Sequence, residues 1–395
     1  MRNDSKLKII PYSRQYIDKT DISCVKKVLK SDFLTTGPEV IKFEKNIKNF
    51  CDSKYALSFN SATSALHAAC FSVGIKKNDY VWTSAISFVA SANSAIYCGA
   101  KIDFLDIDLN TFNICLDKLE NKLLSTKKKY LPKAIIIVHL GGFPLDTQRI
   151  SKLSKKYKFK IIEDASHAIG AIYKNYKIGS CKYSDICIFS LHPVKIITSG
   201  EGGLATCNDQ KLYKKMRLLR EHGIERDKKK FKNRSFLPWI YEQQYLGYNY
   251  RLSDIHAALG SNQLKRINKF VIRRNYIANI YRKELKNLPI KFQSLLKNSF
   301  SSYHLLIVLV EKKIRNKLFQ YLRRRNILVN IHYIPIFIHP YHKSKKFNKN
   351  RFRNSLEYYA RAISLPNYYN LSQKDLKKVI MLIKNFFRKY GSKKN

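Results

Sequence analysis

The sequence predicts an α/β protein with a mostly parallel sheet that is covered by helices on both faces. From Lys54 onward, short apolar segments of strand length alternate with segments of helix length. The strand-length segments are 54–60, 79–84, 101–107, 134–140, 159–165, 185–191 and 203–208. Helices are predicted between several of them, over 62–73, 88–97 and 146–157. Apolar strands that alternate with helices are typical of parallel sheets buried on both faces.

The regions beside this alternation differ in character. Residues 18–51 read as two amphipathic helices around a turn, and Pro38 in that turn suits the first turn of a helix. The stretch 223–247 is basic and irregular, and we predict a mobile surface loop there. The apolar periodicity that follows predicts one long helix over 252–286.

A smaller α+β unit is predicted beyond Pro289. Its segments are the strand 303–310, the helix 311–325, the strand 327–334 and helices towards the C-terminus. The last five residues, 391–395, read as a frayed tail. We therefore predict a large domain over 1–270, with an N-terminal helical arm, and a small C-terminal domain over 271–395.

Composition places the chain among folded proteins without a membrane span. It has 395 residues, of which 45% are apolar. The first ten residues lack the apolar stretch of a signal peptide, and no run reaches the roughly 18 apolar residues of a transmembrane helix. Eight scattered cysteines include no Cys-x-x-Cys pair, which argues against a zinc site and a disulfide framework. We expect a cytoplasmic protein with buried, reduced cysteines and no metal.

The charge is unusual, because 75 Lys and Arg residues outnumber 28 Asp and Glu residues and give a net charge of +47. Such a balance is typical of proteins that bind nucleic acid or anionic membranes. The lysines are spread along the whole chain, however, and Lys, Asn, Ile and Tyr are abundant together. We therefore interpret the charge as compositional drift rather than as a nucleic-acid site. A positive surface would in either case attract phosphorylated substrates.

Ligands bind at the carboxyl ends of parallel strands, so residues at the ends of the predicted strands are the candidates for binding and catalysis. Ser61, Ala62 and Thr63 lie between the strand 54–60 and the following helix. Free backbone N–H groups and hydroxyls at such a helix start can bind a phosphate. An ordinary Ser/Thr helix cap explains the same residues, and both interpretations stay open.

Two ionisable residues follow other strands. Asp164 ends a strongly apolar strand, where a carboxylate can cap a helix, pair with a cation or keep a ring nitrogen protonated. Lys195 follows the strand 185–191 and precedes the Gly-rich segment 198–203, which allows close backbone approach to a ligand. Most lysines of this chain are expected to be solvated, but one at this position could form a Schiff base with a carbonyl cofactor.

Two further motifs are ambiguous by themselves. Phe88 follows the strand 79–84 and either stacks on a flat ligand or packs in the core. The segment 247–251 opens the long predicted helix, and a capping role for Ser253 accounts for much of it. The order of all these motifs along the chain is more informative than any one of them.

Six of these segments resemble the DegT family of sugar aminotransferases, which have the fold-type-I fold of pyridoxal-phosphate enzymes. The resemblance runs from Ile10 to about Leu382, nearly the whole chain. Its segments are 60–67, 163–168, 190–195, 200–203, 220–223 and 247–251. It implies a mostly parallel central sheet flanked by helices, with a smaller C-terminal α+β domain.

The resemblance also implies roles for individual residues. Lys195 would form the Schiff base with pyridoxal 5′-phosphate, Asp164 would pair with the pyridinium nitrogen, and Phe88 would lie against the ring. Further cofactor contacts would come from Ser61, Ala62, Thr63, His167, Ser190 and Asn249. Asn249 would reach the phosphate bound by the other subunit, which implies an obligate homodimer with shared active sites. His167 departs from the commonest pattern, in which glutamine stands three residues after the aspartate.

Three short stretches, 10–18, 31–38 and 330–335, resemble the branch of the family that acts in the pseudaminic acid pathway. That branch aminates the C4 ketone of a UDP-linked 4-keto-6-deoxy-N-acetyl sugar, with L-glutamate as amino donor. By this resemblance His332 lies near the substrate entrance, and Arg251 is the second expected substrate contact. The expected chemistry is a ping-pong transamination in which the freed Lys195 amine moves a proton.

Several alternatives stay open on the sequence. A different nucleotide keto-sugar is one, and a sugar dehydratase on the same scaffold is another, although such dehydratases tend to carry histidine in place of Lys195. A nucleic-acid-binding protein would use residues 251–266 as a helix-turn-helix with Gly260 in the turn, but one uninterrupted amphipathic helix fits as well. A non-catalytic regulatory homologue is disfavoured because Lys195 and Asp164 are both present.

Overall fold

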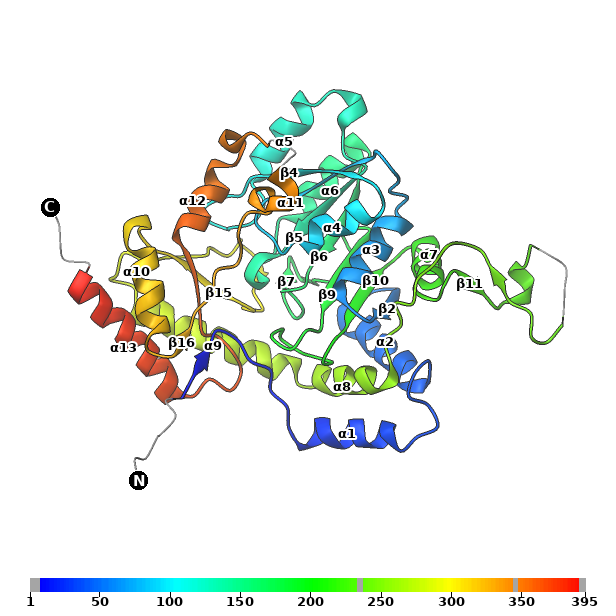
Figure 1. Ribbon diagram of the computed structural model, residues 1–395, viewed down its shortest axis with the longest axis horizontal. Helices are drawn as coiled ribbons and strands as arrows, with labels where there is room; N and C mark the ends of the chain where they lie inside the picture. The colour runs from blue at the N-terminus through cyan, green and yellow to red at the C-terminus, as the bar shows by residue number, and fades with distance from the viewer. Residues whose placement is uncertain (1–7, 233–236, 344–346, 391–395) are drawn as a thin grey trace.

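A seven-stranded sheet forms the centre of the computed structural model, which describes residues 8–232, 237–343 and 347–390 (Figure 1). Its strands, in chain order, are β2 (Tyr55–Phe59), β3 (Tyr80–Ser84), β4 (Lys101–Leu105), β5 (Ala134–Val138), β6 (Lys160–Asp164), β9 (Ile186–Ser190) and β10 (Gly203–Cys207). The spatial order is β2-β10-β9-β6-β5-β3-β4. Among these seven strands, β10 runs antiparallel to its neighbours β2 and β9. The predicted mostly parallel sheet is confirmed.

Helices cover both faces of this sheet, as β5 shows most clearly. Ala134 and Ile136 join the apolar cluster under one set of helices, whereas Ile135 and Ile137 join the cluster under the other set. Successive side chains of a strand point to opposite faces, so a strand without polar residues needs cover on both. The helices of the first face are α3 (Ala62–Ser72), α4 (Ala90–Tyr97) and α7 (Gln210–Arg220). Those of the other face include α2 (Pro38–Cys51), α5 (Leu116–Ser125) and α6 (Thr147–Tyr157).

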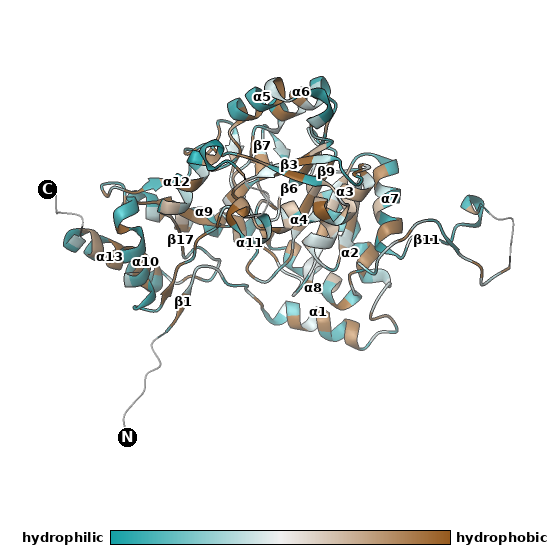
Figure 2. Cartoon of the chain, turned by 45° about the horizontal axis from the view of Figure 1, so that its top comes forward, coloured by the Kyte–Doolittle hydropathy of each residue, from teal (hydrophilic) through white to brown (hydrophobic). Residues whose placement is uncertain are grey.

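Helices α5 and α7 have no counterpart among the predicted elements. Both sequences mix charged and apolar residues, and α5 buries only Leu119 and Leu123. Figure 2 shows the contrast between the hydrophobic strands of the sheet and the hydrophilic outer face of α5. Both helices are amphipathic, so their apolar periodicity is present in the sequence and could have predicted them.

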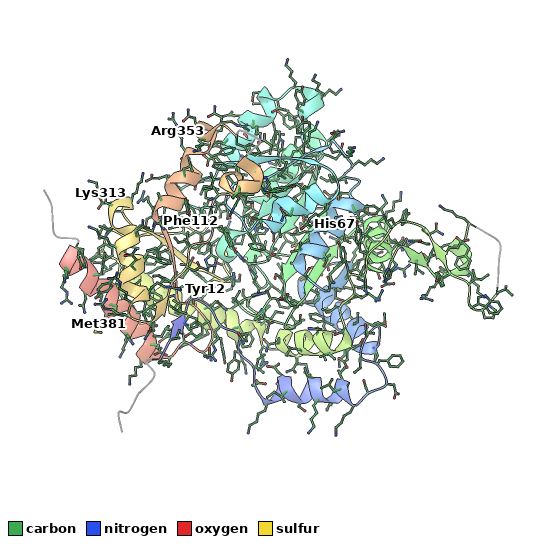
Figure 3. All side chains as sticks on the ribbon, viewed as in Figure 1. Tyr12, His67, Phe112, Lys313, Arg353 and Met381 are labelled. Atoms are coloured by element: carbon green, nitrogen blue, oxygen red, sulfur yellow. The ribbon has the colours of Figure 1, made fainter. Side chains whose placement is uncertain are left out.

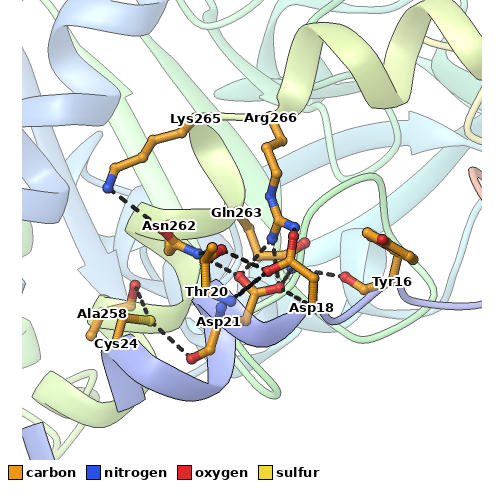
Figure 4. A network of polar contacts seen from close by, with 10 residues as sticks. All are labelled: Tyr16, Asp18, Thr20, Asp21, Cys24, Ala258, Asn262, Gln263, Lys265 and Arg266. Atoms are coloured by element: carbon orange, nitrogen blue, oxygen red, sulfur yellow. Dashed lines mark hydrogen bonds and ion pairs between the residues drawn. The ribbon is translucent and has the colours of Figure 1, made fainter. Parts of the chain in front are cut away.

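The predicted long helix over 252–286 consists of two helices, α8 (Asp254–Leu264) and α9 (Ile267–Glu284). The break coincides with an ion-pair network to the N-terminal helix α1 (Lys19–Leu29), shown in Figure 4. There the guanidinium of Arg266 lies 2.5 Å from a carboxylate oxygen of Asp21 and also contacts Asp18. Asn262 and Gln263 each donate a 2.8 Å hydrogen bond to the same Asp21 carboxylate. These contacts hold α1 along α8, which is the N-terminal helical arm expected from the sequence.

The helix-turn-helix alternative is wrong, because Gly260 lies in the middle of α8 rather than in a turn. A Cβ atom on Gly260 would come within 2.7 Å of the Phe43 ring of α2. Helix α8 packs against both α1 and α2, so its faces are buried in the fold. A buried helix cannot enter a DNA groove.

The described residues of the stretch 223–247 are largely irregular, as predicted, and include one short antiparallel pair of strands that forms a ribbon. Strands β11 (Ile224–Glu225) and β12 (Glu242–Gln243) pair antiparallel, and the ribbon projects from the body at the right of Figure 1. At its base, Gly223 and Gly247 are in close backbone contact; a Cβ on Gly247 would lie 2.1 Å from the nitrogen of Gly223. Two-residue strands are too short to produce a periodic pattern in the sequence.

The C-terminal region forms the predicted smaller α+β unit. Its sheet contains β13 (Lys291–Phe292), β15 (Leu306–Leu309) and β17 (Ala362–Leu365), and its helices are α10 (Lys312–Arg323), α11 (Pro340–Lys343), α12 (Arg353–Arg361) and α13 (Gln373–Tyr390). The other short strands form two small sheets, β1 (Ile10–Pro11) with β16 (Ile327–Leu328), and β14 (Ser299–Phe300) with β7 (Ile172–Tyr173) and β8 (Tyr176–Lys177). Residue 270 lies within α9, and the division of the chain into two domains at that point stays a prediction.

The predicted strand over 327–334 is wrong beyond Leu328. The hydroxyl of Tyr358 donates a 2.5 Å hydrogen bond to the carbonyl of His332, and Asn330 forms an isolated bridge with Ser364. These bonds take the place of a regular strand ladder. Further along, the N–H of Ile336 donates a 2.9 Å hydrogen bond to the carbonyl of Ala85, which follows β3 of the central sheet. The predicted frayed tail, 391–395, lies outside the described residues.

All eight cysteines are free, as expected, and five of them are buried. Cys24, Cys98 and Cys115 are only partly buried, so the expectation of burial is wrong for these three. Burial raises the pKa of Cys51 to about 12, which makes its thiol unreactive. Among the described residues, no helix combines the length and the apolar composition that a membrane span requires.

Candidate active site

A cavity of about 390 Å³ lies at the carboxyl edge of the central sheet. The parallel strands β2, β3, β5, β6 and β9 end at this edge, and the antiparallel β10 begins there. The predicted site residues that line the cavity are Ser61, Ala62, Thr63, Phe88, Asp164, His167, Ser190, Lys195 and His332. The topology therefore brings together residues that are up to 271 positions apart in the chain, from Ser61 to His332.

The start of α3 forms one wall of the cavity. Ser61 is its N-cap, and its hydroxyl accepts a 3.1 Å hydrogen bond from the backbone N–H of Ser64. The capping interpretation is thus confirmed, but it leaves the first helical N–H groups free. No hydrogen bond within the described part of the chain uses the backbone N–H of Ala62 or Thr63. A helix start with free N–H groups at a cavity wall is a binding site for an anion such as a phosphate.

The backbone of Gly203, in the Gly-rich segment 198–203, lies very close to the start of α3. A Cβ on Gly203 would come within 2.2 Å of the carbonyl oxygen of Ser61. At Gly203 the close backbone approach is therefore between β10 and the start of α3. Glu201 of the same segment lines the cavity, and close approach of this segment to a ligand stays a prediction. Gly203 pairs with Phe59 on one side and with Ser190 on the other, which places Ser190 beside the helix start.

Asp164 is buried, and both of its carboxylate oxygens are held by hydroxyl groups. Ser91 of α4 donates a 2.5 Å hydrogen bond to Oδ2, and Ser166 donates a 2.6 Å hydrogen bond to Oδ1. The adjacent Glu163 points to the other face of the strand, where its carboxylate lies 2.6 Å from Nε2 of His139. Of the two acidic residues, Asp164 faces the cavity and Glu163 is part of the structural core.

Lys195 lies in the loop that follows β9. Burial lowers the pKa of its amine to about 8, although the Asp164 carboxylate opposes this shift. About a tenth of the amine is therefore uncharged at pH 7, and this uncharged form is the nucleophile. The preceding residue, Val194, accepts a 2.8 Å hydrogen bond from Ser13 of the N-terminal segment. Tyr12 of the same segment lines the cavity and lies near the centre of the molecule in Figure 3.

Three buried histidines, His167, His304 and His332, line the wall of the cavity next to the C-terminal unit. Burial is the main cause that lowers their pKa values, and the charge of Lys195 adds to it. The pKa of His332 falls to about 3, and those of the other two fall well below the usual range. At neutral pH these imidazoles are uncharged, so they offer hydrogen bonds without repelling Lys195.

Phe88 precedes α4 by two residues and is 56% exposed. The alternative that it packs in the core is therefore wrong. Its ring lies 6.0 Å from that of Tyr333, and both residues line the cavity. An exposed aromatic face at a cavity wall suits a flat ligand.

Several cavity residues were not predicted as site residues, namely Tyr12, Ser87, Ser166, His304 and Tyr333. Tyr12 and Tyr333 lie within the stretches 10–18 and 330–335, so the sequence held a signal for both. His304 precedes an apolar strand of the C-terminal unit and carried no signal of function. The same holds for Ser91, which reaches Asp164 from within a helix.

Asn249 and Arg251 do not line the cavity. The backbone of Asn249 forms an isolated bridge with Glu221, and its carbonyl lies 3.3 Å from Nδ2 of Asn60. Their expected contacts with a cofactor phosphate of a second subunit and with substrate stay predictions.

The chain is similar in sequence and in fold to known proteins. The model of the DegT/DnrJ/EryC1/StrS aminotransferase family matches residues 15–384. This chain belongs to that family. A UDP-4-amino-4,6-dideoxy-N-acetyl-β-L-altrosamine transaminase from Campylobacter jejuni is 38% identical to this aminotransferase over 373 residues, which cover 93% of this chain and 95% of the relative.

Solved structures agree with this relationship. PseC from Helicobacter pylori, an aminotransferase of pseudaminic acid biosynthesis, is 32% identical with a TM-score of 0.87 and covers 97% of this chain and 100% of its own. A putative sugar aminotransferase from Streptococcus pneumoniae in its PLP form is 28% identical with a TM-score of 0.88, covering 97% and 99%. The predicted family, fold class and enzyme class are confirmed, as is the resemblance to the pseudaminic acid branch.

Proposed function

We propose that this aminotransferase uses pyridoxal 5′-phosphate to transfer an amino group from L-glutamate to the C4 ketone of a UDP-linked 4-keto-6-deoxy-N-acetylhexosamine. The observation that carries the proposal is one cavity in which the amine of Lys195, the carboxylate of Asp164 and the free start of α3 meet. The choice of sugar is supported by the names of the Campylobacter and Helicobacter relatives.

Different residues of the cavity suit the different chemical groups of pyridoxal 5′-phosphate. The N–H groups of Ala62 and Thr63 and the hydroxyl of Ser190 suit its phosphate. Asp164 suits a protonated ring nitrogen, because a buried carboxylate stabilises an adjacent cation. The bound cofactor would act as an electron sink for the carbanion that forms on proton removal. The exposed face of Phe88 suits the ring.

Lys195 is the proton carrier in this proposal. Its Nζ, with a pKa lowered to about 8, takes a proton from the α-carbon of glutamate and later delivers one to C4 of the sugar. Asp164 is fixed in orientation by Ser91 and Ser166, so its carboxylate is held at one end of the cavity. The neutral histidines keep further positive charge away from the Lys195 amine.

A second copy of the chain is the proposed partner. Large apolar side chains are exposed on the projecting ribbon, where Leu246 is 81% and Trp239 is 73% exposed. Exposed apolar residues of this size are typical of a protein–protein interface. Asn249 lies close to the ribbon in sequence, which supports its proposed contact with the phosphate bound by the other subunit. No arginine of the described residues lines the cavity, so an arginine of the partner is a suitable ligand for the glutamate carboxylates.

The test is turnover with ¹⁵N-labelled L-glutamate and the UDP-linked keto-sugar, followed by mass spectrometry and NMR of the sugar product. The proposal expects ¹⁵N on C4 of the sugar and formation of 2-oxoglutarate. Amination of a different nucleotide keto-sugar alone would overturn the substrate but not the reaction. Loss of water from the sugar without gain of nitrogen would favour the dehydratase alternative and contradict the proposal.

A further inference from the structure

His167 lines the cavity and takes part in a chain of polar contacts. The backbone N–H of Gly141 donates a 3.3 Å hydrogen bond to Nδ1 of His167, and Nε2 lies 3.0 Å from the hydroxyl of Tyr333. The His167 and Tyr333 rings are stacked, with an interplanar angle of 20°. Both ring nitrogens of His167 are therefore engaged by protein groups, although the sequence suggested a cofactor contact for this residue.

The position of the Gly141 donor is fixed by its surroundings. Gly141 has a φ of 71°, and a Cβ at this position would lie 2.9 Å from Oε1 of Gln293. A residue other than glycine would be strained here. The carbonyl of Gly141 accepts a 3.2 Å hydrogen bond from the N–H of Leu305, which helps to fix this backbone segment. The carbonyl of His167 in turn accepts a 2.9 Å hydrogen bond from Ser302.

These contacts determine which ring nitrogen of His167 carries the proton. A ring nitrogen that accepts a hydrogen bond carries no proton, so Nδ1 of His167 is unprotonated. The remaining proton of the neutral ring is on Nε2, which then donates to the oxygen of Tyr333. Burial and the charge of Lys195 hold the pKa of His167 well below its usual range, which keeps the ring neutral.

The hydroxyl proton of Tyr333 is left free to form a hydrogen bond with a ligand in the cavity. Its ring lines the cavity between Phe88 and His167, with ring centroids 6.0 Å from each. Burial raises the pKa of the Tyr333 phenol, so the hydroxyl stays protonated. Because its oxygen accepts from His167, its own O–H is available to another acceptor.

We propose that Tyr333 is a hydrogen-bond donor to an oxygen atom of the bound cofactor or sugar, and that His167 is a positioning residue that acts only through Tyr333. The proposal deepens the proposed function, since it concerns the same cavity. The acceptor is an anionic or carbonyl oxygen, which the ring oxygen of the cofactor and the ketone of the sugar both provide. His167 fixes the direction of the Tyr333 O–H because the imidazole occupies the other side of the oxygen.

A double-mutant cycle tests this arrangement. Tyr333→Phe removes only the hydroxyl, His167→Met removes the donor, and His167→Gln keeps an amide that can reach the position of Nε2. Tyr333→Phe is expected to lose about tenfold either in cofactor affinity, measured by absorbance titration of the cofactor-free protein, or in kcat/KM for the sugar. A loss of cofactor affinity identifies the cofactor oxygen as acceptor, and a loss confined to the sugar identifies the ketone.

His167→Met is expected to show a loss similar to that of Tyr333→Phe, the double variant is expected to lose no more than either single one, and His167→Gln is expected to restore most of the loss. Additive losses would overturn the proposal, because they would mean that His167 contacts the ligand itself. A Tyr333→Phe variant equal to wild type in both measurements would also overturn it.

¹⁵N NMR of histidine-labelled protein without cofactor provides a readout that needs neither binding nor turnover. The proposal expects His167 to be neutral with its proton on Nε2 at pH 7. A proton on Nδ1, or a charged ring, would overturn the assignment whether or not the enzyme is an aminotransferase. Thermal unfolding of each variant checks that the fold is retained.

Discussion

The hydroxyl of Ser91 donates a 2.5 Å hydrogen bond to Oδ2 of Asp164 and so connects helix α4 to the end of strand β6. Ser91 is completely buried, and Ser87 lies 2.7 Å from its oxygen. The carboxylate on which the proposed cofactor site depends is therefore oriented by a neighbouring helix. Ser91 holds Oδ2 of Asp164 in place, and the carboxylate lines the cavity.

Ser91→Ala is expected to lower the free energy of unfolding by about 2 kcal/mol, since it removes a hydrogen bond to a buried charge. It should also weaken cofactor binding, because the Asp164 carboxylate loses its fixed orientation. Ser94→Ala is the matched control, as Ser94 is equally buried on the same helix but has no contact with Asp164. Denaturant unfolding and absorbance titration measure the two effects. Equal cofactor affinity in both variants would contradict the role of Ser91.

The amine of Lys195 should set the pH dependence of cofactor attachment. Its pKa is lowered to about 8 by burial, and only the uncharged amine attacks an aldehyde. The rate of attachment is therefore expected to rise with pH through a midpoint near 8. Because Asp164 favours the charged amine, Asp164→Asn should lower this midpoint further. Stopped-flow mixing of cofactor-free protein with pyridoxal phosphate gives both values. A midpoint near the usual pKa of lysine, or an upward shift in the variant, would contradict this account.

Two substitutions at the start of α3 should distinguish an effect on stability from an effect on phosphate binding. Ser61→Ala removes the helix cap and is expected to lower the free energy of unfolding by about 1 kcal/mol. Thr63→Ala removes a cavity hydroxyl that makes no capping bond, so it should weaken cofactor affinity without a change in stability. The thermal midpoint and the dissociation constant of pyridoxal phosphate distinguish the two. The assignment fails if Thr63→Ala leaves the affinity unchanged.

If the two subunits of a dimer share their active sites, two inactive variants should regain activity when they are mixed. Lys195→Ala and Asn249→Ala impair residues that the proposal assigns to one site but to different subunits. Mixed dimers then contain one intact site, and random exchange of subunits should restore about a quarter of the wild-type sites. The matched control is Lys195→Ala mixed with Asp164→Asn, which line the same cavity of one chain and should restore nothing. If the first pair also stays inactive after subunit exchange, Asn249 does not act across an interface.

The sheet and the residues at its strand ends could be predicted because they depend on local sequence. Strand β5 has five apolar residues in succession, Asp164 is the last residue of β6, and Lys195 lies in the loop after the apolar strand β9. Parallel strands end at one edge, so residues that follow them are brought together by topology alone.

The remainder of the site could not be predicted, since it depends on contacts between distant segments. His304 lies outside the predicted motifs, and nothing in the sequence around it indicates that it lines the cavity. Ser91 is only three residues after Phe88, but its contact with Asp164 is not indicated by the local sequence. The break between α8 and α9 also arises at a distance, where Arg266 meets Asp21 of α1. Side-chain contacts of this kind override the periodicity of the local sequence.

The most direct test of the proposed transamination is the first half of the reaction, measured without any sugar. Protein loaded with pyridoxal phosphate is mixed with L-glutamate, and the 2-oxoglutarate released is quantified against the Lys195→Ala variant. The account predicts about one equivalent of 2-oxoglutarate per active site for wild type and none for the variant, as a ping-pong scheme requires. Release of 2-oxoglutarate only when the nucleotide sugar is present, or equal release by Lys195→Ala, would contradict it.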